Sequence, residues 1–377
     1  MRVIQSAIPA LETMSTTVTI SVRLRGFIRG KDYRRCPTEA CDSHLLQRDP
    51  VIVSIVTYHY VRPLRESRFP QIKGLDTAEF REQISYIQKH YSVISGQDLL
   101  LAQQADELAS LPSRSALLTF DDGYLDHFTD VFPILFDAGL PGCFFPVVRS
   151  AAERRLLDAN KIHFILASVK DEQVLIEDIF RTLGSLGYDQ LVSERSDLWA
   201  KLGHASRYDT AEVAFIKSLL QRGLSPEVRG SVTQALFEKY VTNDETGFAE
   251  ELYATTDQLR VMSEGGMYVG CHGYDHTWLG TLTPEAQQSD IEKALAWLEQ
   301  FGGGASPWMM CYPYGSYDTS LLGLLAEAGC AIGLTSAAGI ADLNRDEHLT
   351  LPRLDTNDLP KSAEAAPNEW TLRHVSA

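Results

Sequence analysis

The sequence predicts an α/β fold, in which parallel strands alternate with helices and one helical segment interrupts the alternation. Apolar, β-branched runs of strand length recur along the chain, the first being VIVSIVTYHYV at residues 51–61. Segments with apolar residues at helical spacing separate these runs. Because successive strand–helix–strand units favour parallel pairing, the pattern indicates one sheet with helices packed outside it.

Residues 51–150 hold the first part of this alternation. In chain order, the predicted elements are a strand at 51–61, a helix at 76–91, a short strand at 91–94, a strand ending at 122, a helix at 124–140 and a strand at 142–148. The first helix begins at an N-cap, Asp76 or Thr77. The second ends at Gly139 and contains Pro133, which predicts a kink or a late helix start.

Residues 151–252 break the alternation. Three stretches in this region have the apolar spacing of helices, at 160–169, 171–188 and 210–223, and few strand candidates accompany them. We interpret the region as a helical insertion or cap within the α/β domain.

The alternation then resumes and continues to the C-terminal region. The predicted elements are a helix with Thr256 as its N-cap, a strand at 267–272, a helix at 283–304, a strand at 308–314, a helix at 319–328 and strands at 331–336 and 349–355. Residues 49–377 are therefore expected to form one domain that the insertion interrupts. Residues 1–48 are basic and aperiodic, and we expect either a flexible arm or an extension upstream of the true start.

Composition excludes several classes of function. The chain has 377 residues and a net charge of −16, which argues against general binding to nucleic acid or to an anionic membrane surface. The six cysteines are scattered, and this distribution favours buried free thiols over a disulfide framework, although Cys36 and Cys41 are close enough in sequence to pair. No apolar run approaches the roughly 20 residues of a membrane span. Because no secretory signal is evident, we expect a cytoplasmic location.

The stretch LLTFDDGYL at residues 117–125 is the first that suggests chemistry. Its apolar strand ends on two adjacent carboxylates, Asp121 and Asp122. Neighbouring carboxylates repel each other and are costly to bury unless a positive group holds them. The simpler alternative is a solvated turn after the strand.

A second stretch, VGCHGYDHTW, offers ligands for a positive group. His272 and His276 follow a predicted strand, and two imidazoles at a strand-to-loop corner are natural ligands of a divalent metal. Together with Asp122 they would make a set of two nitrogens and one oxygen, which leaves positions open for water and substrate. Asp121 would then remain ionised beside the metal as a base. The alternative is two unrelated surface histidines.

A third stretch, CYPYGSYD at residues 311–318, follows another strand. Tyr312, Tyr314 and Tyr317 offer flat apolar walls with hydroxyl groups, which suit the binding of sugar rings. A buried aromatic turn would have the same pattern.

These three stretches resemble, in order, the motifs of the polysaccharide deacetylase family, also called the NodB-homology fold or carbohydrate esterase family 4. TFDDG resembles the first motif, His-x-x-x-His the second and YPYG the third, and the resemblance covers residues 50–150 and 253–360. It implies a distorted (β/α) barrel of seven to eight strands, (β/α)7-8, and hydrolysis of an N-acetyl group on an amino sugar. It also implies one divalent metal, zinc first and cobalt or nickel as alternatives.

The resemblance also implies residue roles. Asp121 corresponds to the general base, and Asp122, His272 and His276 correspond to the metal ligands. The chain departs from the second motif at Gly273, where Ser or Thr is usual, so a loop hydrogen bond is expected to be missing.

The third motif and the expected acid also depart from the family's pattern. Cys311 stands where an arginine often holds the base; we expect Arg353, oriented by Asp355, to replace it, with a surface Arg–Asp pair as the alternative. The family's late Leu-x-His motif is not evident. Some branches carry an acid histidine at the end of the first strand, so we favour His59 over His348 as the general acid.

The leading hypothesis is therefore a metal-dependent hydrolase that removes an N-acyl group, most simply acetyl, from an amino sugar of a surface glycan or its precursor. The helical insertion is expected to narrow the active site, which favours a small glycan, a nucleotide sugar or a lipid-linked sugar over a long polymer. We expect this substrate to be processed on the cytoplasmic side, at the inner face of the membrane. One alternative is a C–N hydrolase of cyclic imides or ureides on the same fold. Another is a catalytically inactive glycan-binding module.

Overall fold

The computed structural model describes residues 49–302 and 307–374. The arm expected at residues 1–48 lies outside these residues, as do Cys36 and Cys41. The four cysteines within them are free and buried, in agreement with the sequence prediction: Cys143, Cys271, Cys311 and Cys330. No helix of the described residues is long and apolar enough to cross a membrane.

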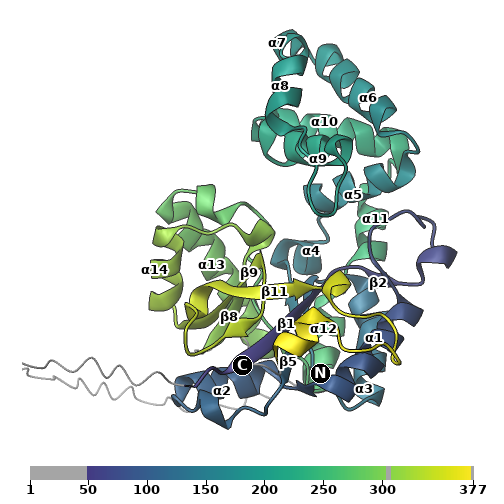
Figure 1. Ribbon diagram of the computed structural model, residues 1–377. Coiled ribbons are helices and arrows are strands. Elements are labelled where there is room, and N and C mark those ends of the chain that lie inside the picture. The colour runs from purple at the N-terminus through teal and green to yellow at the C-terminus, as the bar shows by residue number, and fades with distance from the viewer. Residues whose placement is uncertain (1–48, 303–306, 375–377) are drawn as a thin grey trace, which may run out of the picture. The chain divides into compact units, whose positions relative to one another are not determined.

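Seven parallel strands form the central sheet, and they follow one another around it in chain order. Figure 1 labels five of them: β1, β5, β8, β9 and β11. They are β1 (Ile52–Tyr58), β5 (Ser115–Asp122), β6 (Cys143–Pro146), β7 (Tyr268–Val269), β8 (Trp308–Cys311), β9 (Cys330–Ala338) and β11 (Leu351–Asp355). β11 pairs with β1, so only the seam between β7 and β8 remains to be joined.

A single parallel bridge between Cys271 and Met310 joins that seam. The Cys271 amide donates to the Met309 carbonyl at 3.1 Å, and the Cys311 amide donates to the Cys271 carbonyl at 2.8 Å. The seven strands therefore close into a distorted (β/α) barrel, as the resemblance implied. The described residues also form four further strands of two residues each: β2 (Val61–Arg62), β3 (Leu75–Asp76), β4 (Ser92–Val93) and β10 (Ala341–Asp342). β10 runs antiparallel to β1.

Helices separate the barrel strands along the chain. The α-helices of the barrel are α1 (Thr77–His90), α2 (Gly96–Gln104), α3 (Phe132–Asp137), α12 (Thr256–Glu264), α13 (Pro284–Leu298) and α14 (Thr319–Glu327), and α15 (Glu369–Arg373) follows the last strand. Short 3-10 or π turns are η1 (Leu64–Glu66), η2 (Leu108–Ser110), η3 (His127–Val131), η5 (Leu279–Thr281), η6 (Glu299–Phe301), η7 (Pro313–Gly315), η8 (His348–Thr350) and η9 (Thr356–Asp358).

Two of the predicted helices begin differently from the expectation. Pro133 lies in the first turn of α3, where its missing N–H costs no hydrogen bond, and a π turn precedes it, so the helix starts late. The N-cap of α12 is Thr255, whose hydroxyl accepts from the Gln258 amide in a capping box; the prediction of Thr256 was wrong by one residue.

The strands bury both faces. Val53, Ile55 and Leu117 belong to a cluster with Met309 and Ile332 from the opposite side of the sheet, which fills the barrel interior. The alternate residues of β1 and β5 pack in a second cluster with residues of α1 and α3. This two-sided burial explains why the strand sequences read as continuous apolar runs.

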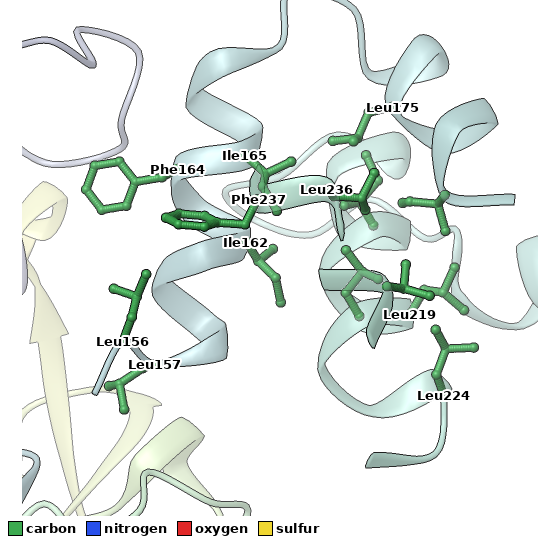
Figure 2. Close-up of a cluster of buried hydrophobic side chains, with 14 of the residues drawn as sticks. Leu156, Leu157, Ile162, Phe164, Ile165, Leu175, Leu219, Leu224, Leu236 and Phe237 are labelled. Carbon is green, nitrogen blue, oxygen red and sulfur yellow. The ribbon is translucent and has the colours of Figure 1, made fainter. Parts of the chain in front are cut away.

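The region between β6 and α12 is helical, as its sequence pattern predicted. Its elements are α4 (Val148–Glu153), α5 (Asp158–Ser168), α6 (Glu172–Ser185), α7 (Asp189–Ser193), α8 (Arg195–Leu202), α9 (Ala211–Ser218), η4 (Leu219–Gly223), α10 (Pro226–Tyr240) and α11 (Glu245–Leu252). Figure 2 shows Ile162 and Ile165 of α5 beside Leu236 and Phe237 of α10. The same apolar cluster includes Tyr124 of the barrel, and barrel and insertion belong to one compact unit.

Candidate active site

The predicted catalytic and metal-binding residues gather at the carboxyl ends of the barrel strands. Asp121 and Asp122 end β5, and His272 follows β7. Arg353 lies in β11, and His59 directly follows β1. Parallel strands of a closed barrel bring these ends to one rim, where (β/α) barrels place their chemistry. The rim encloses a cavity of about 350 Å3 that all five residues line.

Asp122, His272 and His276 converge on one point. Asp122 Oδ1 lies 3.3 Å from Nε2 of His272 and 3.3 Å from Nε2 of His276. All three side chains are at least nine-tenths buried. Burial alone would raise the pKa of Asp122, but the two imidazoles beside it hold that pKa well below its usual range.

This arrangement fits a bound divalent cation. Ligands about 2.0–2.1 Å from a tetrahedral zinc ion lie about 3.3 Å from one another. His272 Nδ1 lies 2.7 Å from the Cys311 carbonyl oxygen and donates to it, so the Nε2 lone pair is free to bind a metal. Asp122 Oδ1 is buried without a hydrogen-bond partner among the described residues. A buried acceptor of this kind is costly unless a cation satisfies it.

Gly273 accounts for the loop between the two histidines. It has a φ of +73°, and a Cβ there would lie 2.9 Å from Asp290 Oδ1. The Asp290 carboxylate accepts from the amides of Tyr274 and Asp275, at 2.8 and 3.2 Å. Gly273 cannot make the side-chain hydrogen bond that Ser or Thr would make at this position. The Asp290 carboxylate of α13 holds the loop instead.

Asp121 and Arg353 form a buried, bidentate pair. Arg353 Nη1 and Nη2 donate to the two carboxylate oxygens at 3.0 and 2.8 Å, and both side chains are at least 95% buried. Burial opposes ionisation of Asp121, but the Arg353 guanidinium holds its pKa below its usual range. Asp121 is therefore ionised, and Thr57 Oγ1 also donates to it at 3.3 Å.

Arg353 is held by backbone and hydroxyl groups, not by Asp355. Its Nε donates to the Thr335 carbonyl at 2.9 Å, and its Nη1 donates to Thr119 Oγ1 at 3.2 Å. The Asp355 carboxylate instead accepts from Asn357, where it caps η9. The prediction that Asp355 orients Arg353 was wrong, because this carboxylate satisfies the first amides of the turn that follows the strand.

The two candidate acids lie in different places. His59 Nε2 is 3.9 Å from Asp121 Oδ2, and its side chain is 47% exposed toward the cavity. The buried ring of His127 donates from Nε2 to the His59 carbonyl at 2.8 Å, and burial lowers the pKa of His127 to about 4. His348 donates to the Leu343 carbonyl and does not line the cavity.

The three tyrosines predicted to bind sugar differ in position. Tyr314 lines the cavity, and its ring packs on His276 with centroids 4.6 Å apart. Tyr312 also contributes to the wall but is buried, and its hydroxyl donates to the Leu349 carbonyl at 2.8 Å. Tyr317 is not in the cavity wall: it lies beyond the turn η7, 41% exposed, and packs against Tyr312. Substrate binding by Tyr317 therefore stays a prediction, outside the wall of this cavity.

Three residues of the site have left-handed backbone conformations. Asp122, His276 and Tyr314 have φ values of 72°, 53° and 57°, and they are half of the six non-glycine residues with positive φ in the described part of the chain. Each such residue costs about 1–3 kcal/mol. The surrounding contacts therefore hold Asp122 and His276, two candidate metal ligands, and the Tyr314 ring in place against local backbone strain.

The insertion also supplies residues to the cavity wall, and no sequence pattern predicted these residues. His163 of α5, Gln221 of η4 and the neighbouring pair Arg207 and Tyr208 line it. Burial lowers the pKa of His163 to about 3, so its imidazole is neutral. No local motif marks these residues, because they approach the rim only through the packing of the insertion.

A buried network connects the insertion to Asp122. Tyr124 donates from its hydroxyl to Asp122 Oδ2 at 2.5 Å, and Asn160 Nδ2 donates to that hydroxyl at 2.7 Å. Asn160 also contacts Tyr60 at 2.9 Å and accepts from Tyr253. The oxygen of Asp122 that faces away from the histidines is thereby fixed.

The Tyr124→Phe variant should bind its metal about 10–100-fold more weakly, because it loses the hydrogen bond that orients a ligand. Titration with a competing chelator measures this affinity. Tyr86→Phe is the matched control, since Tyr86 is equally buried and bonds to Thr371 Oγ1 at 2.8 Å, away from the site. Equal metal affinity in the Tyr124→Phe and Tyr86→Phe variants would contradict a positioning role for Tyr124.

Comparison with known proteins is consistent with this site. The model of the polysaccharide deacetylase family matches residues 232–333, which include His272, His276 and Tyr314 but not Asp121. The resemblance to this family that the sequence predicted is therefore confirmed for residues 232–333. The "Putative polysaccharide deacetylase YxkH" of Bacillus subtilis (strain 168) is 27% identical over 95 residues, 25% of this chain. The chain matches only 33% of the length of that relative.

Several solved structures are similar over most of the chain at low identity. The Streptococcus pyogenes deacetylase PplD in complex with acetate has a TM-score of 0.49 and 16% identity, over 84% of this chain and 96% of that one. IcaB from Ammonifex degensii has a TM-score of 0.45 and 16% identity, over 86% and 96%. A de-N-acetylase from Aggregatibacter actinomycetemcomitans has a TM-score of 0.46 and 14% identity, over 84% and 97%.

Proposed function

We propose that this protein is a metal-dependent hydrolase that removes an N-acyl group, most simply acetyl, from an amino sugar. The observation that carries the proposal is the pair of neighbouring carboxylates with separate partners. Asp122 faces His272 and His276, whereas Asp121 is held by Arg353. One carboxylate is thus available to bind a cation and the other to accept a proton.

The metal site comprises Asp122, His272 and His276, with zinc as the first choice and cobalt or nickel as alternatives. When bound, such an ion polarises the amide carbonyl and lowers the pKa of a water molecule. Asp121 is the general base. Because Arg353 lowers its pKa, Asp121 is a weak base, suited to a water that has been acidified.

His59 is the general acid of this proposal. Its Nε2 reaches to within 3.9 Å of Asp121 and is open to the cavity, so it can protonate the amine that leaves when the amide bond breaks. The bond between its carbonyl and His127 fixes the backbone at this point. Tyr314 lines the cavity beside His276, where the edge of its ring can contact a sugar.

Replacement of His59 by Ala should lower kcat about 10²–10⁴-fold without loss of metal. The side chain is half exposed, so we expect no change in thermal stability. His348→Ala serves as the control, because that histidine lies away from the cavity. Initial rates on an N-acetylated oligosaccharide and metal content measure both effects. A wild-type rate in the His59→Ala protein would mean that water, and not His59, protonates the leaving amine.

The experiment that tests the function combines elemental analysis with a substrate panel. The metal-loaded protein is incubated with N-acetylated sugars, with N-formylated sugars and with cyclic imides and ureides, and released acid or amine is measured. Release from the sugars supports the proposal. Turnover of the cyclic imides or ureides alone would favour the C–N hydrolase alternative. Sugar binding without turnover, in protein that carries metal, would favour an inactive binding module.

A further inference from the structure

A second and larger cleft adjoins the proposed metal site. Its volume is about 890 Å3, and its walls come from the insertion and from the loop after β7. His276 and Tyr314 line both this cleft and the active-site cavity, and so do Ala159 and Gln221 of the insertion. A substrate seated at the metal site can therefore extend into the cleft without leaving the protein surface.

The cleft is rich in cationic side chains. Five of them line it: Arg149, Arg155, Lys161, Arg222 and Arg229. Two of the five are neutralised by carboxylates in the same wall. Arg149 pairs with Asp275, and Lys161 pairs with Glu245 at 3.0 Å.

The other three cations are arginines without such a partner. Arg155, Arg222 and Arg229 form no ion pair within residues 49–302 and 307–374; Arg229 donates to the Gln221 carbonyl at 2.8 Å. The remaining carboxylate of the cleft wall is Asp158. Three arginines against one aspartate leave the cleft positive, in a chain whose net charge is −16.

An aromatic column connects the metal site to this charge. The Trp278 and Tyr314 rings are stacked, with centroids 4.4 Å apart and an interplanar angle of 4°. Tyr314 packs on His276, and the Arg222 guanidinium lies 5.7 Å from the centroid of the Trp278 ring. The column leads from the metal site to Arg222, so a substrate that lies along it brings a charged substituent close to Arg222.

Two buried polar atoms in the same wall lack partners. Trp278 Nε1 and Thr277 Oγ1 are buried and have no hydrogen-bond partner among the described residues, and both residues line the cleft. A buried donor left unpaired costs about 1–3 kcal/mol.

We propose that this cleft binds an anionic group, a phosphate or a carboxylate, that is attached to the N-acylated sugar. Arginine is suited to both anions because its planar guanidinium donates two parallel hydrogen bonds. The proposal rests on the proposed function for the position of the sugar, and it defines the substrate class as an anionic amino-sugar compound. A sugar phosphate and a uronate-containing glycan are the two sources of the charge.

The test compares anionic and neutral probes in the Asp121→Asn variant, which should bind without turnover. The probes are N-acetylglucosamine 1-phosphate, a tetrasaccharide of alternating glucuronate and N-acetylglucosamine, and neutral N,N′-diacetylchitobiose. Titration calorimetry should show at least one anionic probe bound about tenfold more tightly than the neutral one. This advantage should shrink as NaCl is raised, because salt screens charges at a surface. Which anionic probe binds distinguishes phosphate from carboxylate.

Arg222→Gln, and Arg155→Gln as a second variant, should bring the ratio of anionic to neutral affinity close to one. Arg81→Gln is the control, since Arg81 is an exposed arginine of α1 that does not line the cleft, and it should keep the wild-type ratio. Equal affinities for all probes would overturn the proposal. So would a preference that survives Arg222→Gln and Arg155→Gln but is lost in His276→Ala, since the anion would then bind at the metal site. A cleft-dependent preference in a protein that releases no acid from any probe would contradict the proposed function and support the anion site.

Discussion

The His276→Ala variant is expected to lose its divalent metal and its hydrolytic activity together. Removal of one of three protein ligands leaves Asp122 and His272, which cannot hold zinc firmly. Because a bound metal contributes several kcal/mol to transition-state stabilisation, kcat should fall about a thousandfold or more. Elemental analysis after dialysis and initial rates on an N-acetylated sugar measure the two losses.

His348→Ala is the matched control for this experiment. His348 is partly buried and donates to a backbone carbonyl, as an ordinary structural histidine does. The control should keep its metal and its rate. A His276→Ala protein that is fully loaded with metal and active would refute the assignment of His276 as a ligand.

The Asp121→Asn variant is expected to keep its metal and lose about 10²–10⁴-fold in kcat, the contribution of a positioned general base. It should also be less stable, because Arg353 remains buried without a carboxylate. Removal of one partner from a buried pair costs about 3–5 kcal/mol. Urea unfolding, metal content and initial rates separate the three effects.

A double variant distinguishes the chemistry from the stability. Arg353→Met in the Asp121→Asn background removes the unpaired charge, so stability should recover while activity stays low. Recovery of activity along with stability would mean that Asp121 has only a structural role. Loss of metal in Asp121→Asn would place Asp121 among the metal ligands. Asp121 is close enough to His272 and Cys311 to share a metal ion with them.

Sequence reasoning predicted the parts of the site that local patterns encode. Asp121 and Asp122 end an apolar run, and His272 and His276 follow another, so the rule that parallel strands end at one rim brings them together. Arg353 could be proposed for the same reason, since it lies in the last strand. The prediction that these residues lie together depends on the strand order, which the alternation of strands and helices indicates.

The parts that were missed depend on tertiary packing or on a turn. His163 and Gln221 reach the cavity from the insertion, and no spacing in the sequence relates them to Asp121. Tyr317 lies outside the cavity wall because the left-handed conformation at Tyr314 turns the chain within η7. Helix α2 was missed although its signal was present: Ser95 and Asp98 form a capping box.

The left-handed residues of the site have a consequence for protein engineering. Asp122, His276 and Tyr314 occupy conformations that glycine adopts more easily. Glycine at these positions would relieve backbone strain but remove two proposed metal ligands and the aromatic wall. Proteins are readily stabilised by substitutions that relieve such strain, and the recurrent cost is function. A directed-evolution campaign that selects for heat resistance alone would therefore do nothing to preserve the proposed ligands at these strained positions.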